Sequence, residues 1–191
     1  MTAVAQRADE TEAANVRLGV LVFIVSETML FAAFFAAYFF LRGESITWPP
    51  TPEIQRPELP LVALNTLFLL TSSVTLQRAI GRIRAGDARG LVRGVAVTLL
   101  LGAIFLAIQG YEFSRNAFAI SDGVFGSTFY TLTGFHGAHV AAGLVVLAAA
   151  LRRATRGLVT RERHIAVEAA SYYWHFVDAV WLVLFMTVYV L

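Results

Sequence analysis

The chain has 191 residues, of which 58% are hydrophobic and only 15% are charged, a balance too apolar for a soluble domain of this size. It has no cysteine, which excludes disulfides and thiolate metal sites. All 15 basic side chains are arginine, and the net charge of +2 provides no basic face of the kind that nucleic-acid binding needs. We therefore expect an integral membrane protein that does not bind nucleic acid.

Five segments are long and apolar enough to span a membrane, which takes about 20 residues of helix. They lie at residues 18–41, 60–80, 91–111, 127–151 and 170–191. Because they are apolar on most sides, they indicate helices and not the alternating strands of a barrel. We predict an all-α fold, in which a polar tail (residues 1–17) precedes one membrane domain (residues 18–191), a bundle of five transmembrane helices. The first segment is too long for a signal peptide and should stay in the membrane.

The loops between these segments differ in composition. The run Trp48–Pro60 is rich in proline and cannot be helical throughout. The tail and the loops near residues 78–93 and 152–163 together hold twelve of the 15 arginines. Since short arginine-rich loops stay on the cytoplasmic side of a membrane, we predict that the N-terminus lies inside and the C-terminus outside.

Glu27 lies about nine residues into the first segment, which is about 14 Å along a helix. The side chains one turn away, at positions 23, 24, 30 and 31, are apolar and offer no charge partner. Because an ionised carboxylate at this depth costs roughly 2.5–3.5 kcal/mol, we expect Glu27 to be protonated at neutral pH. Two interpretations stay open, a carboxyl group linked to proton movement and a neutral carboxyl that bonds to another helix.

The stretch "TGFHGAHVAAG" places His136 and His139 on one face of the fourth segment. The surrounding glycines and alanines allow close helix contact, across which polar side chains can bond. Zinc needs three or four protein ligands, and two histidines on one helix face cannot sandwich a haem. The chain has only four histidines, of which His164 is in a loop. The pattern favours a fastening between helices over metal or haem binding.

Polar residues also occur in the last and second segments. Glu168, His175 and Asp178 fall on one stripe of the last helix, and His175 and Asp178 could pair with each other. The stripe could relay protons, but it ends halfway across the membrane, so a satisfied internal network is favoured. Asn65 shares a face of the second segment with two hydroxyl side chains, and we expect this face to bond to a neighbouring helix.

Four stretches allow comparison with a known family. They are "VFIVSETMLFAAFFAAYF", "LNTLFLLTSSVT", "QGYEFSRNAFAISDGVFGSTFYTLTGFHGAHVAAG" and "EAASYYWHFVDAVWLVLF", which together cover most of the chain after the tail. In their order and content they resemble subunit III of haem–copper oxidases of the cytochrome c oxidase type, in a short form with five helices. The last two stretches are long and specific.

The resemblance implies a helical bundle docked beside the catalytic subunit of a proton-pumping terminal oxidase, which reduces oxygen to water in aerobic respiration. In that family subunit I holds the haems and one copper, and in cytochrome oxidases subunit II holds the electron-entry copper. This chain would then carry no cofactor, no metal and no catalytic residue. Its implied roles are support of proton uptake, durability of the catalytic subunit and binding of phospholipid. Its partners would be subunits I and II, other small subunits and lipids of a bacterial inner membrane.

The resemblance also suggests roles for individual residues. Glu27 matches the family's membrane glutamate, which lies near a lipid cleft. Positions matching Arg153 and His164 approach lipid headgroups, and the adjacent Arg152 is a further candidate. Longer members have seven helices, and the two that have no counterpart here form one wall of that cleft.

Two other functions compete with this interpretation. One is the related subunit of a quinol oxidase or a nitric oxide reductase, because the site of the electron donor would lie on other chains. The other, from a different class, is a stand-alone proton-coupled transporter. A transporter would need a polar path on both sides of the midplane, and it usually has inverted repeats or broken helices.

Overall fold

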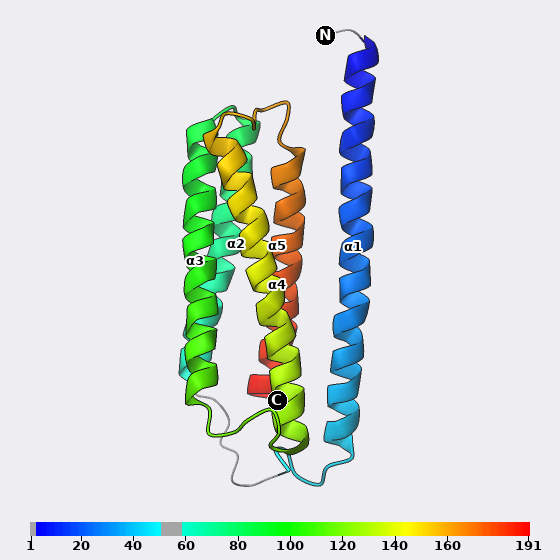
Figure 1. Cartoon of the computed structure of the whole chain (residues 1–191), viewed down its shortest axis with the longest axis vertical. Coiled ribbons are helices and arrows are strands. Elements are labelled where there is room, and N and C mark those ends of the chain that lie inside the picture. Colours follow the sequence, from blue (N-terminus) through cyan, green and yellow to red (C-terminus); the bar gives the residue numbers. More distant parts are fainter. Residues whose placement is uncertain (1–2, 51–58) are drawn as a thin grey trace.

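The computed structural model describes residues 3–50 and 59–191, with side chains from residue 11 onward, and within these residues its regular structure is entirely helical. The helices are, in chain order, α1 (Ala3–Gly43), α2 (Leu59–Arg84), α3 (Ala88–Arg115), α4 (Gly123–Thr155) and α5 (Ile165–Leu184), followed by a π-helical turn, η1 (Phe185–Val190) (Figure 1). Five helices of the described chain are long and apolar enough to cross a membrane. The predicted all-α fold with five spans is therefore confirmed.

The helices extend beyond the apolar segments that predicted them. α1 begins inside the polar tail, whose alanine, glutamate, glutamine and arginine residues favour helix. α2 continues past residue 80 to Arg84, and α3 continues past residue 111 to Arg115. Hydropathy detects the part of a helix that suits lipid, whereas the backbone stays helical until a residue stops it. Most of the proline-rich run Trp48–Pro60 lies outside the described residues, although its last two residues already belong to α2.

A short turn joins α2 to α3. Gly86 has a φ of +85°, a left-handed conformation that glycine adopts at little cost after the end of a helix. Asp87 then caps α3, because its carboxylate accepts a hydrogen bond from the backbone N–H of Gly90 at 2.8 Å. The two residues therefore end one helix and start the next, and α2 and α3 lie antiparallel and side by side (Figure 1).

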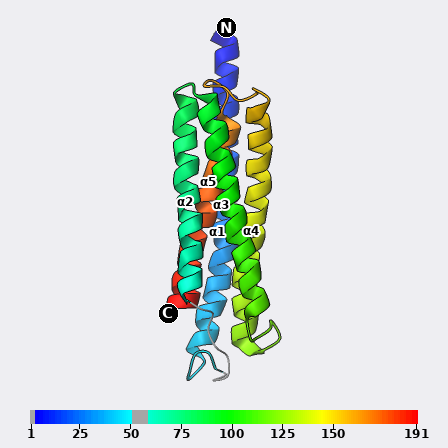
Figure 2. The ribbon, with the colours of Figure 1, turned by 90° about the vertical axis from the view of Figure 1, so that its left-hand side faces the viewer.

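α5 is the central helix of the bundle. It packs against α1, α2 and α4, and 56% of its most apolar window is buried, compared with 6% for α1. α1 lies along α4 and α5 at one side, and its N-terminal part extends beyond the other helices (Figures 1 and 2). Most of the apolar surface of α1 therefore faces lipid or another membrane protein.

The centre of the bundle is built from tryptophan packed against glycine. The indole of Trp174 is fully buried, and a Cβ atom added to Gly102 of α3 or Gly143 of α4 would lie only 2.6 or 2.8 Å from it. The Trp174 Nε1–H donates to the hydroxyl of Ser72 on α2 at 2.9 Å. Three helices thus meet on one side chain of α5, and small residues make that close approach possible.

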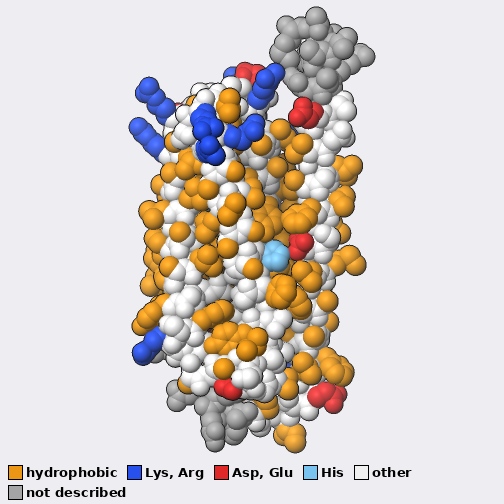
Figure 3. All heavy atoms as spheres, in the orientation of Figure 1, with side chains coloured by type: hydrophobic (Ala, Val, Ile, Leu, Met, Phe, Trp, Pro, Cys, Tyr) orange, Lys and Arg blue, Asp and Glu red, His pale blue; other side chains and the backbone are white. Residues whose placement is uncertain are grey.

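Arginine side chains gather at one end of the bundle. Figure 3 shows them crowded where α2 meets α3 and α4 meets α5, above a broad hydrophobic belt. This uneven distribution is the pattern from which the inside position of the N-terminus was predicted, and that orientation stays a prediction.

Candidate functional site

The membrane carboxylate Glu27 contacts a histidine of another helix. Its Oε2 lies 2.9 Å from Nε2 of His139 on α4, and the two side chains are only 19% and 15% exposed. A histidine beside a carboxylate is visible inside the hydrophobic surface in Figure 3. The apolar side chains one turn away leave Glu27 without a charge partner within α1, and its partner comes from another helix, 112 positions away in the sequence. This contact agrees with the interpretation of a carboxyl group that bonds to another helix.

The second ring nitrogen of His139 limits how protons can be arranged in this pair. Nδ1 lies 2.7 Å from the carbonyl oxygen of Phe135, which can only accept, so Nδ1 carries a hydrogen. If the imidazole is neutral, Nε2 is an acceptor and Glu27 must be a carboxylic acid that donates to it. If the imidazole is charged, Glu27 is a carboxylate. In both forms Glu27 and His139 share one proton, and the pair has no net charge.

His136 points to a different part of the bundle from His139. It is completely buried, its ring stacks on Trp181 of α5 at a centroid distance of 4.9 Å, and the ring of Phe105 on α3 meets it edge-on at 5.9 Å. Neither ring nitrogen has a hydrogen-bond partner in the described part of the chain. Two residues three positions apart on a helix point in directions about 60° apart, and this difference is enough for the two histidines to face different neighbours. The expectation of one shared face was therefore too coarse, because only His139 bonds across a helix contact.

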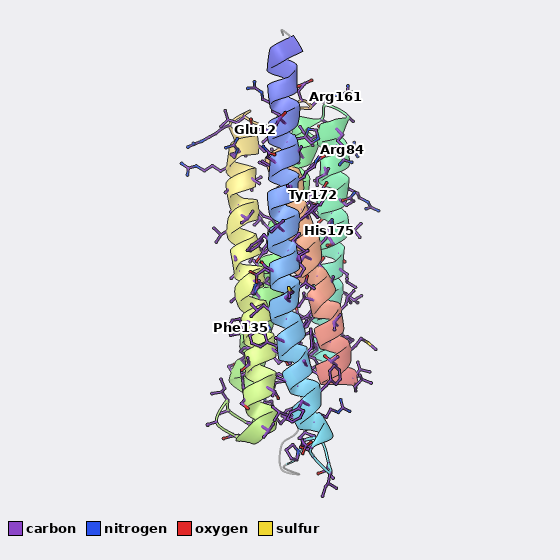
Figure 4. The ribbon with its side chains drawn as sticks, turned by 90° about the vertical axis from the view of Figure 1, so that its right-hand side faces the viewer. Glu12, Arg84, Phe135, Arg161, Tyr172 and His175 are labelled. Atoms are coloured by element: carbon purple, nitrogen blue, oxygen red, sulfur yellow. The ribbon has the colours of Figure 1, made fainter. Side chains whose placement is uncertain are left out.

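The polar residues of α5 form two separate groups and not one stripe. Glu168 lies at the arginine-rich end, where its Oε1 accepts from Arg84 Nη2 at 2.7 Å and contacts His164 Nε2 at 3.1 Å. Its Oε2 accepts from Arg17 of α1 at 3.3 Å. In Figure 4, Arg84 marks this end of α2, and His175 lies further along α5. Glu168 therefore joins α1, α2 and α5 and does not continue into a relay along α5.

The second group on α5 is held by a serine of α2. The hydroxyl of Ser73 lies 2.9 Å from Nδ1 of His175 and donates to Oδ2 of Asp178. His175 and Asp178, which could have paired directly, are instead bridged by the hydroxyl of Ser73. Asp178 is buried, and its Oδ1 finds no partner in residues 11–50 or 59–191. The arrangement resembles a fastening between two helices more than a path for protons.

Asn65 and its hydroxyl neighbours bond α2 to α3. The amide of Asn65 donates to the carbonyl oxygen of Phe105 at 3.1 Å, and the hydroxyls of Thr75 and Thr98 lie 2.8 Å apart. Ser72, on the same face, accepts from Trp174 of α5. This face of α2 therefore contacts two helices.

Sequence reasoning missed two buried polar residues of α3. Gln109 donates to the carbonyl oxygen of Thr133 at 3.0 Å, and Glu112 accepts from the hydroxyl of Tyr189 at 3.0 Å. Both are almost fully buried. The only available signal was a charged residue directly after the predicted end of the third segment at 111. Extending the predicted third segment by one turn would have placed Glu112 inside the helix.

Two of the three lipid candidates, Arg153 and His164, line a cavity of about 460 Å³ at the arginine-rich end. Arg153, Arg163 and His164 line it together with the carboxylates Glu12 and Glu162 and with apolar side chains, whereas Arg152 is exposed and does not line it. Nε2 of His164 is already bonded to Glu168. The backbone N–H of Glu162 and the hydroxyl of Thr160 hold the pKa of the Glu162 carboxyl, also in this lining, below its usual range.

No group of three or more histidine, aspartate or glutamate side chains that could hold a metal ion occurs among the residues whose placement is described. Residues 5–191 match the model of a protein family described as cytochrome c oxidase subunit III. The chain belongs to this family. It is thus a multi-pass integral membrane protein of the oxidase subunit III type, and the resemblance inferred from the sequence is confirmed.

Relatives that are similar in sequence carry a name that agrees with this family description. The chain is 42% identical over 176 residues to cytochrome c oxidase subunit 3 of Synechocystis sp., an alignment that covers 91% of this chain and 74% of that protein. It is 39% identical to the protein of that name from Thermostichus vulcanus, covering 91% and 86% of the two chains, and 41% identical to that from Cyprinus carpio, covering 92% and 69%. These names favour the oxidase subunit over the quinol oxidase, nitric oxide reductase and transporter alternatives.

Proposed function

We propose that this chain is a non-catalytic subunit III of a proton-pumping haem–copper oxidase, and that it supports the catalytic subunit while electrons move through other chains. The match to the subunit III family over residues 5–191 carries this proposal. The haems and copper would belong to subunits I and II, which with other small subunits are the partners. The membrane would be the inner membrane of a bacterium, with the N-terminus of the chain inside.

The pair Glu27–His139 is the part of the chain best suited to support proton uptake. Oε2 of Glu27 lies 2.9 Å from Nε2 of His139, and both side chains are partly exposed at the contact of α1 with α4. Since an ionisable residue inside a membrane is more often functional than structural, we assign this pair a role in holding or exchanging a proton near the catalytic subunit.

The cavity at the arginine-rich end is our proposed site for a phospholipid headgroup. Arg153 and Arg163 supply positive charge, as anionic headgroups require, and the volume of about 460 Å³ provides space for one. Arg152, exposed beside the cavity, would add to the local positive potential. Since Glu162 stays anionic, the phosphate would contact the arginines of the lining and not this carboxylate.

Purification of the tagged chain from native membranes in mild detergent tests the proposal. We expect haem absorbance and larger subunits to elute together with the tagged chain, whereas untagged membranes treated in parallel should give neither. A chain that elutes alone and colourless, and that conducts protons after reconstitution into liposomes, would contradict the proposal and support the transporter interpretation.

A further inference from the structure

Three buried polar side chains on three helices leave hydrogen-bonding atoms unused in the interior of the bundle. Asn65 of α2, Gln109 of α3 and His136 of α4 are 1%, 2% and 0% exposed. In the described residues, Oδ1 of Asn65, Oε1 of Gln109 and both ring nitrogens of His136 have no hydrogen-bond partner. A buried polar group without a partner costs roughly 1–3 kcal/mol, so three of them in one place need a physical explanation.

Each of the three side chains is a neighbour of Phe105, in space or along α3. The Asn65 amide nitrogen bonds to the carbonyl of Phe105 at 3.1 Å, and the Phe105 ring lies 5.9 Å from the ring of His136. Gln109 follows Phe105 by one helical turn. A Cβ atom added to Gly137 would lie 3.0 Å from Oε1 of Gln109, so this oxygen faces the backbone directly beside His136.

The bonds already made determine which atoms are left over. The amide nitrogens of Asn65 and Gln109 donate to the carbonyls of Phe105 and Thr133, and because carbonyls only accept, neither amide can be turned around. The two amide oxygens that remain are acceptors. A neutral His136 adds one N–H donor and one acceptor nitrogen. The atoms without a partner in the described residues are therefore three acceptors and one donor, and a small ligand that donates two hydrogen bonds and accepts one would satisfy all of them except one ring nitrogen of His136.

We propose that a water molecule binds between Asn65, Gln109 and His136. It donates its two hydrogens to Oδ1 of Asn65 and Oε1 of Gln109, and it accepts the N–H of His136. Three hydrogen bonds are the usual number for a buried water, and such waters bind where buried polar groups lack protein partners. Trp181 closes the site on the side of α5, because its ring stacks on that of His136.

Bound in this way, the water would join α2, α3 and α4 through one molecule. It would give His136 the interhelical hydrogen bond that no described side chain offers it. The site depends only on residues of this chain and is independent of the partner subunits proposed above.

A high-resolution cryo-EM map of the native complex, purified from its own membranes, tests the proposal directly. We expect a density peak within hydrogen-bond distance of both amide oxygens and of one His136 nitrogen. A map that resolves ordered water elsewhere in the complex but has no peak at this position would overturn it.

Solid-state NMR of the complex in lipid provides a second measurement that needs no map. Polarisation transferred from water protons should reach the ¹⁵N-labelled ring of His136 in the native protein, and Gln109→Leu should reduce this transfer at least twofold. Gln77→Leu, at an exposed glutamine of α2, is the matched control and should leave the transfer unchanged. Equal transfer in the native protein and in Gln109→Leu, or none in the native protein, would contradict a bound water.

Discussion

At the scale of single residues, two substitutions of Glu27 should differ in whether they keep the hydrogen bond to His139. A glutamine at position 27 can still donate an N–H to Nε2 of His139, so we expect Glu27→Gln to retain the contact between α1 and α4. Glu27→Leu removes it and should lower the free energy of unfolding in detergent by about 0.6 kcal/mol, and by no more than about 1.7 kcal/mol. Denaturation of the two variants side by side measures the difference, and equal losses would contradict a bond at this position.

The protonation state of Glu27 is a separate question that infrared spectroscopy can decide. We expect a band of a protonated carboxyl group in the native protein at pH 7, which disappears in Glu27→Gln. A carboxylate band that the same substitution removes would show instead that the pair consists of an imidazolium and a carboxylate.

Ser73 should matter more than its size suggests, because it provides the only described hydrogen bond of the Asp178 carboxyl group. Ser73→Ala leaves this buried carboxyl without a partner, and we expect a loss of about 1–3 kcal/mol in the free energy of unfolding. The control is Ser26→Ala, since the Ser26 hydroxyl bonds within its own helix and is exposed. A double variant, Ser73→Ala with Asp178→Leu, removes both partners and should recover part of the loss. If the double variant is less stable than Ser73→Ala, the explanation fails.

The presence of these polar groups could be predicted from the sequence, but their partners could not. Glu27, His139, His175 and Asp178 stand out because a membrane segment contains few such residues. Their partners depend on the rotation of each helix and on the order of helices around α5, and a single sequence carries little information on either. Gln109 could not be predicted for another reason, because a neutral amide in an apolar segment carries no charge that would mark it as a site.

At the scale of helices, close contacts are made where glycine faces Trp174. Gly143→Ala would place a Cβ atom 2.8 Å from the indole, so the ring or α4 must move. We expect a loss of about 1–3 kcal/mol in stability, as for other overpacked cores. Gly134→Ala on the same helix is the control, because its Cβ would meet nothing within 4 Å. That control should be neutral or stabilising by about 0.5–1 kcal/mol, since alanine favours helix. Thermal denaturation in detergent would contradict this prediction if both variants behaved alike.

Helix existence was the most predictable level of the structure, because five apolar segments of this length have few alternatives in a membrane. The ends were less predictable. The polar first turns of α1 and the last turns of α2 and α3 continue the helix beyond the apolar segment. Hydropathy therefore placed Glu112 just outside the third span, although it is buried inside the bundle beside Tyr189.

At the scale of the whole molecule, α1 is a peripheral helix held by polar contacts along its length. Arg17 bonds to Glu168, Glu27 to His139, and the hydroxyl of Tyr38 donates to the carbonyl of Thr187 at 3.0 Å. These residues are ten and eleven positions apart, which is about three helical turns, so they lie on one face of α1. The opposite face is apolar and exposed, which suits a helix that lies between this bundle and lipid or a partner subunit.

The orientation of the bundle can be tested because the native chain has no cysteine. Ser121, in the loop between α3 and α4, and Thr155, at the last turn of α4, are exposed at opposite ends of the molecule. If arginine-rich loops stay inside, a membrane-impermeant maleimide should label Ser121→Cys in intact cells and Thr155→Cys only after permeabilisation. Both substitutions are conservative in size, and the cysteine-free chain gives the background. The reverse labelling pattern would place the arginine-rich end outside. It would also move the Glu168 cluster and the proposed headgroup cavity to the outer leaflet. The anionic lipids of the inner surface could then not explain the arginines at either place.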